Sequence, residues 1–387
     1  MTDGPIFTAA ELAEVKAYHA PRYTFDAVDT LVWPLLLVLV VRFVTAPLYR
    51  LAVRLTTRWR STVLDRVWKG PGWGPTIAFA LLLFALFSVV TMPSDVWFGF
   101  VREHQYGLST ASAWVYALDS FKAHLVTALA VLSLAFGLFG LARRLRHWWW
   151  VMGLVASLVM SASAAIDPYR SRLYIDQKPL PEGTLRTQIL ALVEKANVEV
   201  ADVLVDETLT RTVRLQAYFA GTGPTRTIVL NDALLKNLTE DEVLAAVAHE
   251  SGHVHESRWP ARLLSALALF AFLGLVEWIF RRSAKRGWFG ITERADIRTL
   301  PLILLLFDLS MTLGGPVSGW VSRRREWAAD RYAMELTHDP DAFASMLVKA
   351  TRVNKMDPEP PRWVVLAGLS HPPVGERIAF ARRFMPR

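Results

Sequence analysis

Apolar residues in this chain gather into long blocks that alternate with polar stretches. Six blocks reach or approach the ~20 residues that a helix needs to cross the hydrocarbon core of a bilayer. They occupy residues 31–48, 76–92, 125–141, 148–166, 263–280 and 299–318. Three tryptophans open the fourth block, as is typical of a membrane interface. The pattern predicts an integral membrane protein with about six helical spans.

The remaining polar stretches are long enough to fold outside the membrane. Residues 167–260 predict a helix near 185–196 and two short strands, near 200–205 and 227–230. Residues 319–387 predict further helices interrupted by prolines. We therefore expect an α+β unit that combines two separate parts of the chain.

Composition narrows the class of protein. Hydrophobic residues make up 53% of the 387 residues and charged residues 20%, and the mean hydropathy is +0.28. These values exclude a disordered chain and are too apolar for an ordinary soluble enzyme of this length. The absence of cysteine excludes disulfides, a thiolate nucleophile and a cysteine-ligated metal. The excess of Lys and Arg, a net charge of +8, gathers beside the apolar blocks, which favours the lipid bilayer over nucleic acid as a partner.

The sharpest motif is His249-Glu250-Ser251-Gly252-His253, on a predicted helix that starts with a capping box at 239–242. Positions i and i+4 lie on one face of a helix, so the two imidazoles can share one Zn²⁺. Glu250 lies about 100° away around the helix axis and can reach a water at the metal as a general base. Gly252 leaves room for another element to pack close beside the metal. Taken alone, the pattern also fits a pair of surface histidines.

A second predicted helix, directly after the last apolar block, offers a third ligand. Glu326 would complete a site of two histidines and one glutamate, with a fourth position open to water. Asp330, one turn later on the same face, would accept the second ring N–H of a ligating histidine. Alternatively, these acidic residues could belong to a solvated charged face of the helix, because several arginines lie close to them in the sequence. The two helices together predict one catalytic zinc ion per chain.

The membrane layout allows the two helices to meet. The helix with the histidines ends where the fifth block begins, and the helix with Glu326 starts where the sixth block ends. Two spans joined by one loop return the chain to the same side of the membrane. Glu277, near the end of the fifth block, is expected to reach the interface by snorkelling.

The predicted fold is mainly α: a polytopic membrane helix bundle with a zincin-like α+β catalytic domain that carries a short sheet. The predicted parts are an N-terminal segment (1–30), a membrane region of four spans (31–166), the first part of the catalytic domain (167–260), a membrane region of two spans (261–318) and the second part of the catalytic domain (319–387).

Together these motifs resemble the CAAX prenyl protease type 1 family, membrane zinc metallopeptidases that trim prenylated C-terminal tails. The resemblance runs from about residue 92 to 384. Besides the histidine motif, it rests on FVREHQYG (100–107), PLPEG (179–183), AYFAG (217–221), IVLND (228–232), RREWAAD (324–330) and SHPPVGER (370–377). Several spaced motifs in the same order are far more specific than any one of them.

The resemblance implies roles for individual residues. It makes His249, His253 and Glu326 the zinc ligands and Glu250 the base. It makes His371 a donor to the developing oxyanion, although the sequence alone also fits a rigid turn residue before two prolines.

The resemblance also implies that Arg377 supports the oxyanion region. The family usually has Asn immediately before Ala217, where this chain has Gln216, an amide on a longer arm. We expect Gln216, Ala217 and Tyr218 to bind substrate, with a peptide lying beside residues 215–221 as an added edge strand.

The orientation in the membrane has conflicting signals. The loops after the first, third and fifth spans hold most of the short-loop Lys and Arg, which would place the catalytic domain outside the cytoplasm. The resemblance implies a site that faces the cytoplasm, and this is the orientation we expect.

Two other functions share parts of this pattern. A membrane-protein quality-control protease would use the same zinc chemistry on peptide or protein substrates, without specificity for prenylated ones. A non-catalytic membrane scaffold would bind lipid or peptide without cleaving anything. The intact base, ligands and His371 favour an enzyme.

Overall fold

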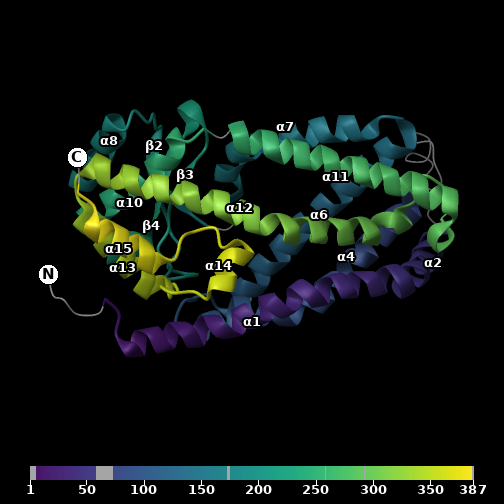
Figure 1. Ribbon diagram of the computed structural model, residues 1–387, viewed down its shortest axis with the longest axis horizontal. Coiled ribbons are helices and arrows are strands. Elements are labelled where there is room, and N and C mark those ends of the chain that lie inside the picture. The colour runs from purple at the N-terminus through teal and green to yellow at the C-terminus, as the bar shows by residue number, and fades with distance from the viewer. Residues whose placement is uncertain (1–5, 58–72, 172–174, 258, 292, 386–387) are drawn as a thin grey trace.

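The computed structural model describes residues 6–57, 73–171, 175–257, 259–291 and 293–385. Long helices form a bundle at one end of the molecule, and a mixed helix and strand domain lies at the other end (Figure 1). The helices α1 and α12 run along the bundle and continue into the mixed domain, so they connect the two ends.

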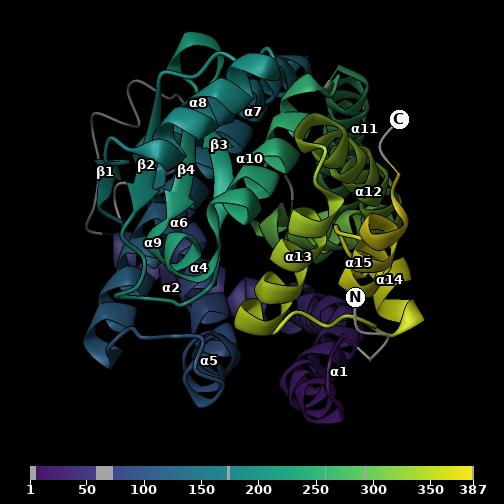
Figure 2. The ribbon, with the colours of Figure 1, turned by 90° about the vertical axis from the view of Figure 1, so that its left-hand side faces the viewer.

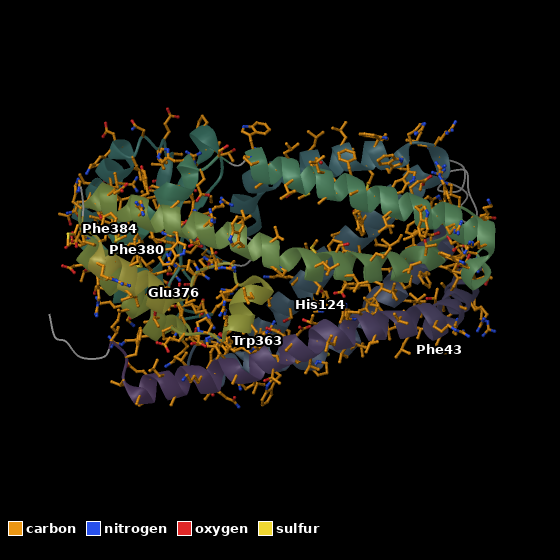
Figure 3. The ribbon with its side chains drawn as sticks, viewed as in Figure 1. Phe43, His124, Trp363, Glu376, Phe380 and Phe384 are labelled. Carbon is orange, nitrogen blue, oxygen red and sulfur yellow. The ribbon has the colours of Figure 1, made fainter. Side chains whose placement is uncertain are left out.

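Five helical segments in the described part of the chain are long and apolar enough to cross a membrane. The first combines α1 (Ala9–Leu39) and α2 (Thr45–Thr56), which are joined by the π-helical turn Val40–Val44. The second combines α4 (Trp73–Val96) and α5 (Arg102–Gln105), which are joined by the π-helical turn Trp97–Val101. The others are α6 (Ala113–Arg144), α11 (Trp259–Arg286) and α12 (Leu300–Thr337) with the 3₁₀ turn Ile297–Thr299 before it. Apolar side chains such as Phe43 point outward from this bundle, as expected of surfaces that face lipid (Figure 3).

The fourth predicted span, residues 148–166, lies in α7 (Trp148–Ser171), whose described apolar part, Trp148–Met160, is shorter than a full span. The first predicted span is longer than expected, because its helix already begins at Ala9. Thr8 and Glu11 form a reciprocal capping box there, which satisfies the backbone N–H groups at the start of the helix. Residues 9–30 therefore lie in the first long helix.

The prediction that Glu277 snorkels to the interface is wrong. Glu277 is 5% exposed, and its carboxylate accepts hydrogen bonds from Trp148 Nε1 at 2.6 Å, Arg281 Nε at 2.5 Å and Arg294 Nη2 at 2.8 Å. A buried carboxylate with three donors has no need of water, so the residue ties α7 and α11 together inside the bundle.

The mixed domain contains a four-stranded sheet in the order β1-β2-β4-β3. Strands β2 and β4 are parallel, and the two outer strands are antiparallel to their neighbours. Its elements are β1 (Gln177–Pro179), α8 (Thr184–Lys195), β2 (Asp202–Asp206), β3 (Ala217–Ala220), the 3₁₀ turn Gly223–Thr225, β4 (Thr227–Asn231), α9 (Asp232–Asn237), α10 (Glu240–His255), α13 (Pro340–Asn354), α14 (Arg362–Gly368) and α15 (Val374–Arg383).

The sequence pattern predicted α8, β2 and β4 at nearly these positions. It did not predict β1 as a strand, because three residues are too few to show an alternating pattern. One hydrophobic core joins side chains from both polar parts of the chain, among them Val243 of α10, Ala333 of α12, Phe343 of α13 and Ile378 of α15. Further aromatic side chains, Phe380 and Phe384, lie at this end of the molecule (Figure 3).

Candidate metal centre and active site

Helix α10 presents the two histidines on one face. Thr239 caps its start, and Glu242 completes the predicted capping box. Apolar residues such as Val243 and Val247 are buried in the domain core and fix the rotation of the helix about its axis. His249 and His253 consequently project side by side, with their ring centroids 4.9 Å apart.

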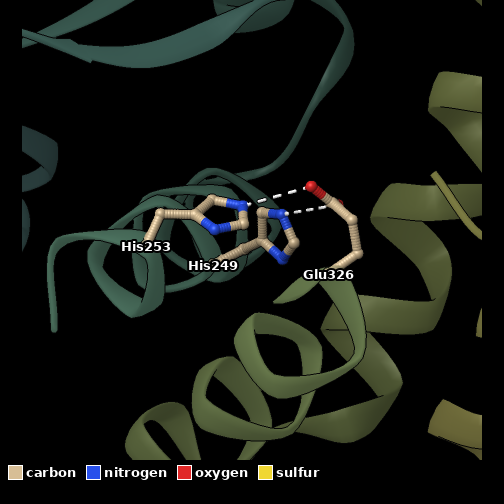
Figure 4. A group of neighbouring side chains, drawn as sticks. All are labelled: His249, His253 and Glu326. Carbon is tan, nitrogen blue, oxygen red and sulfur yellow. Dashed lines mark ion pairs between the residues drawn. The ribbon is translucent and has the colours of Figure 1, made fainter. Parts of the chain in front are cut away.

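Glu326 reaches both imidazoles from α12 (Figure 4). Its Oε2 lies 3.4 Å from Nε2 of His249, and its Oε1 lies 3.4 Å from Nε2 of His253. One ligand atom from each of the three side chains lies within 4.8 Å of the others. Oε2 of Glu326 is buried and has no hydrogen-bond partner among the described residues. Two imidazole nitrogens and an unsatisfied carboxylate oxygen form a donor set that fits a divalent metal ion.

Each histidine also has a carboxylate at its other ring nitrogen. Nδ1 of His249 lies 2.9 Å from Oδ1 of Asp330, and Nδ1 of His253 lies 3.2 Å from Oε1 of Glu256. Asp330 was predicted from the sequence, but Glu256 was not, although its i+3 spacing from His253 on the same helix is a readable signal. Arg325 donates to Glu256 and holds it in place.

Asp330 and Arg377 form a buried ion pair. Asp330 is fully buried, and its two carboxylate oxygens accept hydrogen bonds from Nε and Nη2 of Arg377 at 2.8 and 2.6 Å. Nη2 of Arg377 lies 3.8 Å from Oε2 of Glu326. The guanidinium therefore lies behind the three candidate ligands and is bonded to Asp330, whose Oδ1 lies beside Nδ1 of His249.

The electrostatics of the site favour a bound cation. Burial alone would lower the pKa of His249, but the carboxylates of Asp330 and Glu326 outweigh it and raise this pKa to about 9. Burial raises the pKa of Glu250, which brings a carboxylate closer to the range of an efficient general base near neutral pH.

His371 lies at the open side of the cluster. Its Nε2 is 3.5 Å from Oε1 of Glu326, and its side chain is 57% exposed. The segment before it is held against α12, because Arg323 donates to the backbone carbonyls of Val365 and Leu369 at 2.9 and 2.5 Å. The same segment also packs closely on α12 at Gly319, where an added Cβ would come within 2.7 Å of the backbone of Gly368.

The three residues expected to bind substrate lie at the outer strand of the sheet. Gln216 is exposed and directly precedes β3, while Ala217 and Tyr218 are the first residues of β3. The Tyr218 hydroxyl donates to Asp206 at 2.9 Å. Strand β3 packs against α10, the helix that bears the histidines (Figure 2).

Comparison with known proteins agrees with this arrangement. Residues 179–384 match peptidase family M48, and residues 4–169 match the family described as CAAX prenyl protease N-terminal, five membrane helices. An uncharacterized metalloprotease, YhfN, of Bacillus subtilis is 28% identical over 80% of this chain and 73% of its own. The CAAX prenyl protease 1 homolog of Oryza sativa is 26% identical over 79% of this chain and 72% of its own.

The fold is also found in a solved structure. Ste24p of S. mikatae superposes with a TM-score of 0.83 over 98% of this chain and 91% of that chain, at 19% sequence identity. The family match covers more than half of the chain, including both histidines and Glu326. The chain belongs to peptidase family M48 and is an integral-membrane metalloprotease.

Proposed function

We propose that the metal is a single zinc ion held by His249, His253 and Glu326, and that the enzyme hydrolyses internal peptide bonds of its substrates. The observation that carries the proposal is the convergence of these three ligand atoms, from two helices far apart in the sequence, within 4.8 Å. A zinc ion held there would polarise the scissile carbonyl and make a water molecule acidic enough to attack near neutral pH.

The side chains around the ligands can perform the remaining steps. Glu250 takes a proton from the attacking water and later delivers it to the leaving amine as the C–N bond breaks. His371, exposed at the open side of the cluster, donates a hydrogen bond to the carbonyl oxygen as negative charge develops on it. Asp330 and Arg377 keep His249 in the required orientation.

The substrate is proposed to bind as an extended peptide along the edge of the sheet. Strand β3 is an outer strand of the described sheet, and addition of a strand to such an edge is a common mode of peptide recognition. Gln216, Ala217 and Tyr218 are proposed to contact this peptide. Several relatives are named CAAX prenyl proteases, which favours prenylated or membrane-embedded substrates. A quality-control protease without prenyl specificity is the second candidate, because the site geometry serves both equally.

The decisive variant is Glu250→Gln. It preserves the shape of the side chain but not its basicity, so the purified protein should keep stoichiometric zinc and lose turnover by roughly 10²–10⁴-fold. Glu335→Gln, at an exposed position of α12, is the matched control and should cleave at the wild-type rate. Wild-type turnover in Glu250→Gln would exclude the assignment.

Substrate preference needs a separate measurement. A peptide with a prenylated cysteine and its unmodified twin should differ in kcat/KM if the enzyme is a prenyl protease. Equal values would favour the quality-control function. For the orientation, we propose that the active site faces the cytoplasm, and a reporter fused to the C-terminus should then be active on that side.

A further inference from the structure

The backbone of the proposed substrate strand presents its hydrogen-bonding groups alternately to two sides. In the ladder with β4, Ala217 lies opposite Leu230 and Tyr218 opposite Val229. The next pair, Gln216 and Asn231, is of the hydrogen-bonded type, because the Asn231 N–H donates to the Gln216 carbonyl at 3.1 Å.

Hydrogen-bonded and non-hydrogen-bonded pairs alternate along an antiparallel ladder. Tyr218 and Ala220 therefore direct their N–H and C=O groups toward β4. Leu215, Ala217 and Phe219 direct theirs away from the sheet, to the edge where a peptide would add.

The first of these three outward positions is already paired. The Leu215 N–H donates to Oδ1 of Asn354 at 2.7 Å, and Nδ2 of Asn354 donates to the Leu215 carbonyl at 3.2 Å. A side-chain amide carries one donor and one acceptor in the same arrangement as a residue of a neighbouring strand. The Asn354 side chain thus occupies the backbone hydrogen-bonding groups of Leu215, with which the next residue of an added strand would otherwise pair.

Several elements hold Asn354 in this position. It is the last residue of α13, and its own carbonyl accepts a hydrogen bond from Nη1 of Arg214 at 3.0 Å. Arg214 is held in turn by Glu103, through two-point contacts of 3.0 and 3.2 Å, and by the Tyr18 hydroxyl at 2.7 Å. These partners come from α1 and α5, so the backbone that carries the Asn354 side chain is tied to both elements.

We propose that Asn354 is a specificity-determining residue that sets the register in which a peptide pairs with β3. The peptide pairs with Phe219 and Ala217 and stops there, because the backbone of Leu215 is already satisfied. This inference rests on the proposed function, in which β3 is the substrate strand. It predicts that residues of the substrate beyond the Ala217 pair contribute little to kcat/KM.

The test compares purified full-length wild type with Asn354→Ala on two series of peptides, lengthened stepwise on either side of the scissile bond. Truncation to Ala removes both hydrogen bonds to Leu215 but leaves the Arg214 contact, which uses the backbone carbonyl of residue 354. In the series that grows toward Leu215, wild-type kcat/KM should level off. In Asn354→Ala the plateau should move two residues further, with a gain of about fivefold to tenfold for the longer peptides.

Asn237→Ala is the matched control. Its amide also bonds to a backbone carbonyl, that of Ala233, but at the end of α9, so this variant should keep the wild-type plateau. An unchanged plateau in Asn354→Ala, or an equal loss on all peptide lengths with a normal zinc content, would overturn the proposal.

A second measurement needs no variant at position 354. Methylation of single backbone nitrogens of the best peptide removes one N–H donor at a time. In the wild type, kcat/KM should fall for the donors that reach Phe219 and Ala217 but not for the next outward-facing donor. Sensitivity at that third position would overturn the register proposal alone. The absence of any sensitive position would contradict β3 as the substrate strand, and loss of cleavage in all samples would contradict the proposed function itself.

Discussion

Gly252 of α10 lies against the backbone of Ala329 of α12, where an added Cβ would come within 2.9 Å of the Ala329 Cα. The two histidines flank Gly252 on one helix, and Glu326 and Asp330 flank Ala329 on the other. The closeness of the two backbones therefore sets the distance between the imidazoles and the carboxylates. This is the close approach that the glycine in the histidine motif indicated.

Gly252→Ala should separate the two helices and weaken the metal site. Since backbone atoms of Ala329 cannot yield as a side chain can, the helices have to move, and the three ligand atoms move apart with them. We expect a substoichiometric zinc content and a loss of most activity, measured by elemental analysis and peptide cleavage. The control is Gly274→Ala in α11, where nothing lies within 4 Å of an added Cβ. Full zinc content and normal turnover in Gly252→Ala would refute the claim that the close approach of α10 and α12 at Gly252 sets the distance between the ligands.

Asp330→Asn should damage both stability and metal binding. It removes the carboxylate that pairs directly with the buried guanidinium of Arg377, which costs about 3–5 kcal/mol. It also weakens the partner of His249 Nδ1, which should reduce zinc affinity roughly 10–100-fold. The double variant Asp330→Asn/Arg377→Gln should recover much of the stability but not the zinc affinity. If the double variant were no more stable than Asp330→Asn, the ion pair would not be the source of the loss.

His371→Ala should act on the rate and leave the metal in place. Because the side chain is exposed at the open side of the cluster, its removal disturbs no core packing. Loss of one oxyanion donor predicts a fall in kcat of roughly 10²–10³-fold with little change in KM. His124→Ala, at an exposed position of α6, should cleave normally (Figure 3). A kcat within twofold of wild type in His371→Ala would assign the residue to a structural turn.

Protonation of Glu242 should make the stability of the enzyme fall as the pH is lowered into the acid range. Burial by itself raises its pKa, but hydrogen bonds from Lys349, Ser345 and the Thr239 N–H outweigh burial and hold the pKa below its ordinary value of 4.5. Because the pKa is lower in the folded state, the ionised group stabilises the fold fully above the unfolded value, and the contribution is lost as the pH falls through the folded value.

Glu242→Gln should therefore unfold more easily at pH 7, by roughly 1–3 kcal/mol, and the difference from wild type should shrink below about pH 4.5. Thermal unfolding in detergent between pH 7 and pH 3.5 measures this. Asp241→Asn, exposed on the same turn, serves as control. A constant difference at all pH values would show that the carboxylate charge makes no contribution.

Local sequence patterns were sufficient for the features that depend on one helix or one strand. The capping box at Thr239 and the i, i+4 spacing of His249 and His253 needed only the geometry of an α-helix. The apolar blocks predicted the spans, because a bilayer demands length and apolarity of each span separately. Glu326 was identified as a candidate ligand from its residue type and from the return of the chain to the same side of the membrane.

Features that depend on two distant parts of the chain were not readable in this way. The position of Glu277 near the end of an apolar block predicted that it reaches water, but its three donors come from α7, from its own helix and from the loop before α12. Strand β3 became recognisable as an outer strand only through its pairing with β4.

The sequence by itself determined that this chain spans a membrane and carries two histidines, a glutamate between them and a distant carboxylate, residue types suited to a metal site. Side-chain chemistry and helical periodicity depend on residues that are close in the sequence, so they can be predicted from the order of residues. Only the tertiary structure decided that Glu326 meets both imidazoles, that Arg377 neutralises Asp330 behind them, and that Asn354 pairs with Leu215. Such contacts depend on how separate helices and strands pack against one another, and no local pattern specifies that packing.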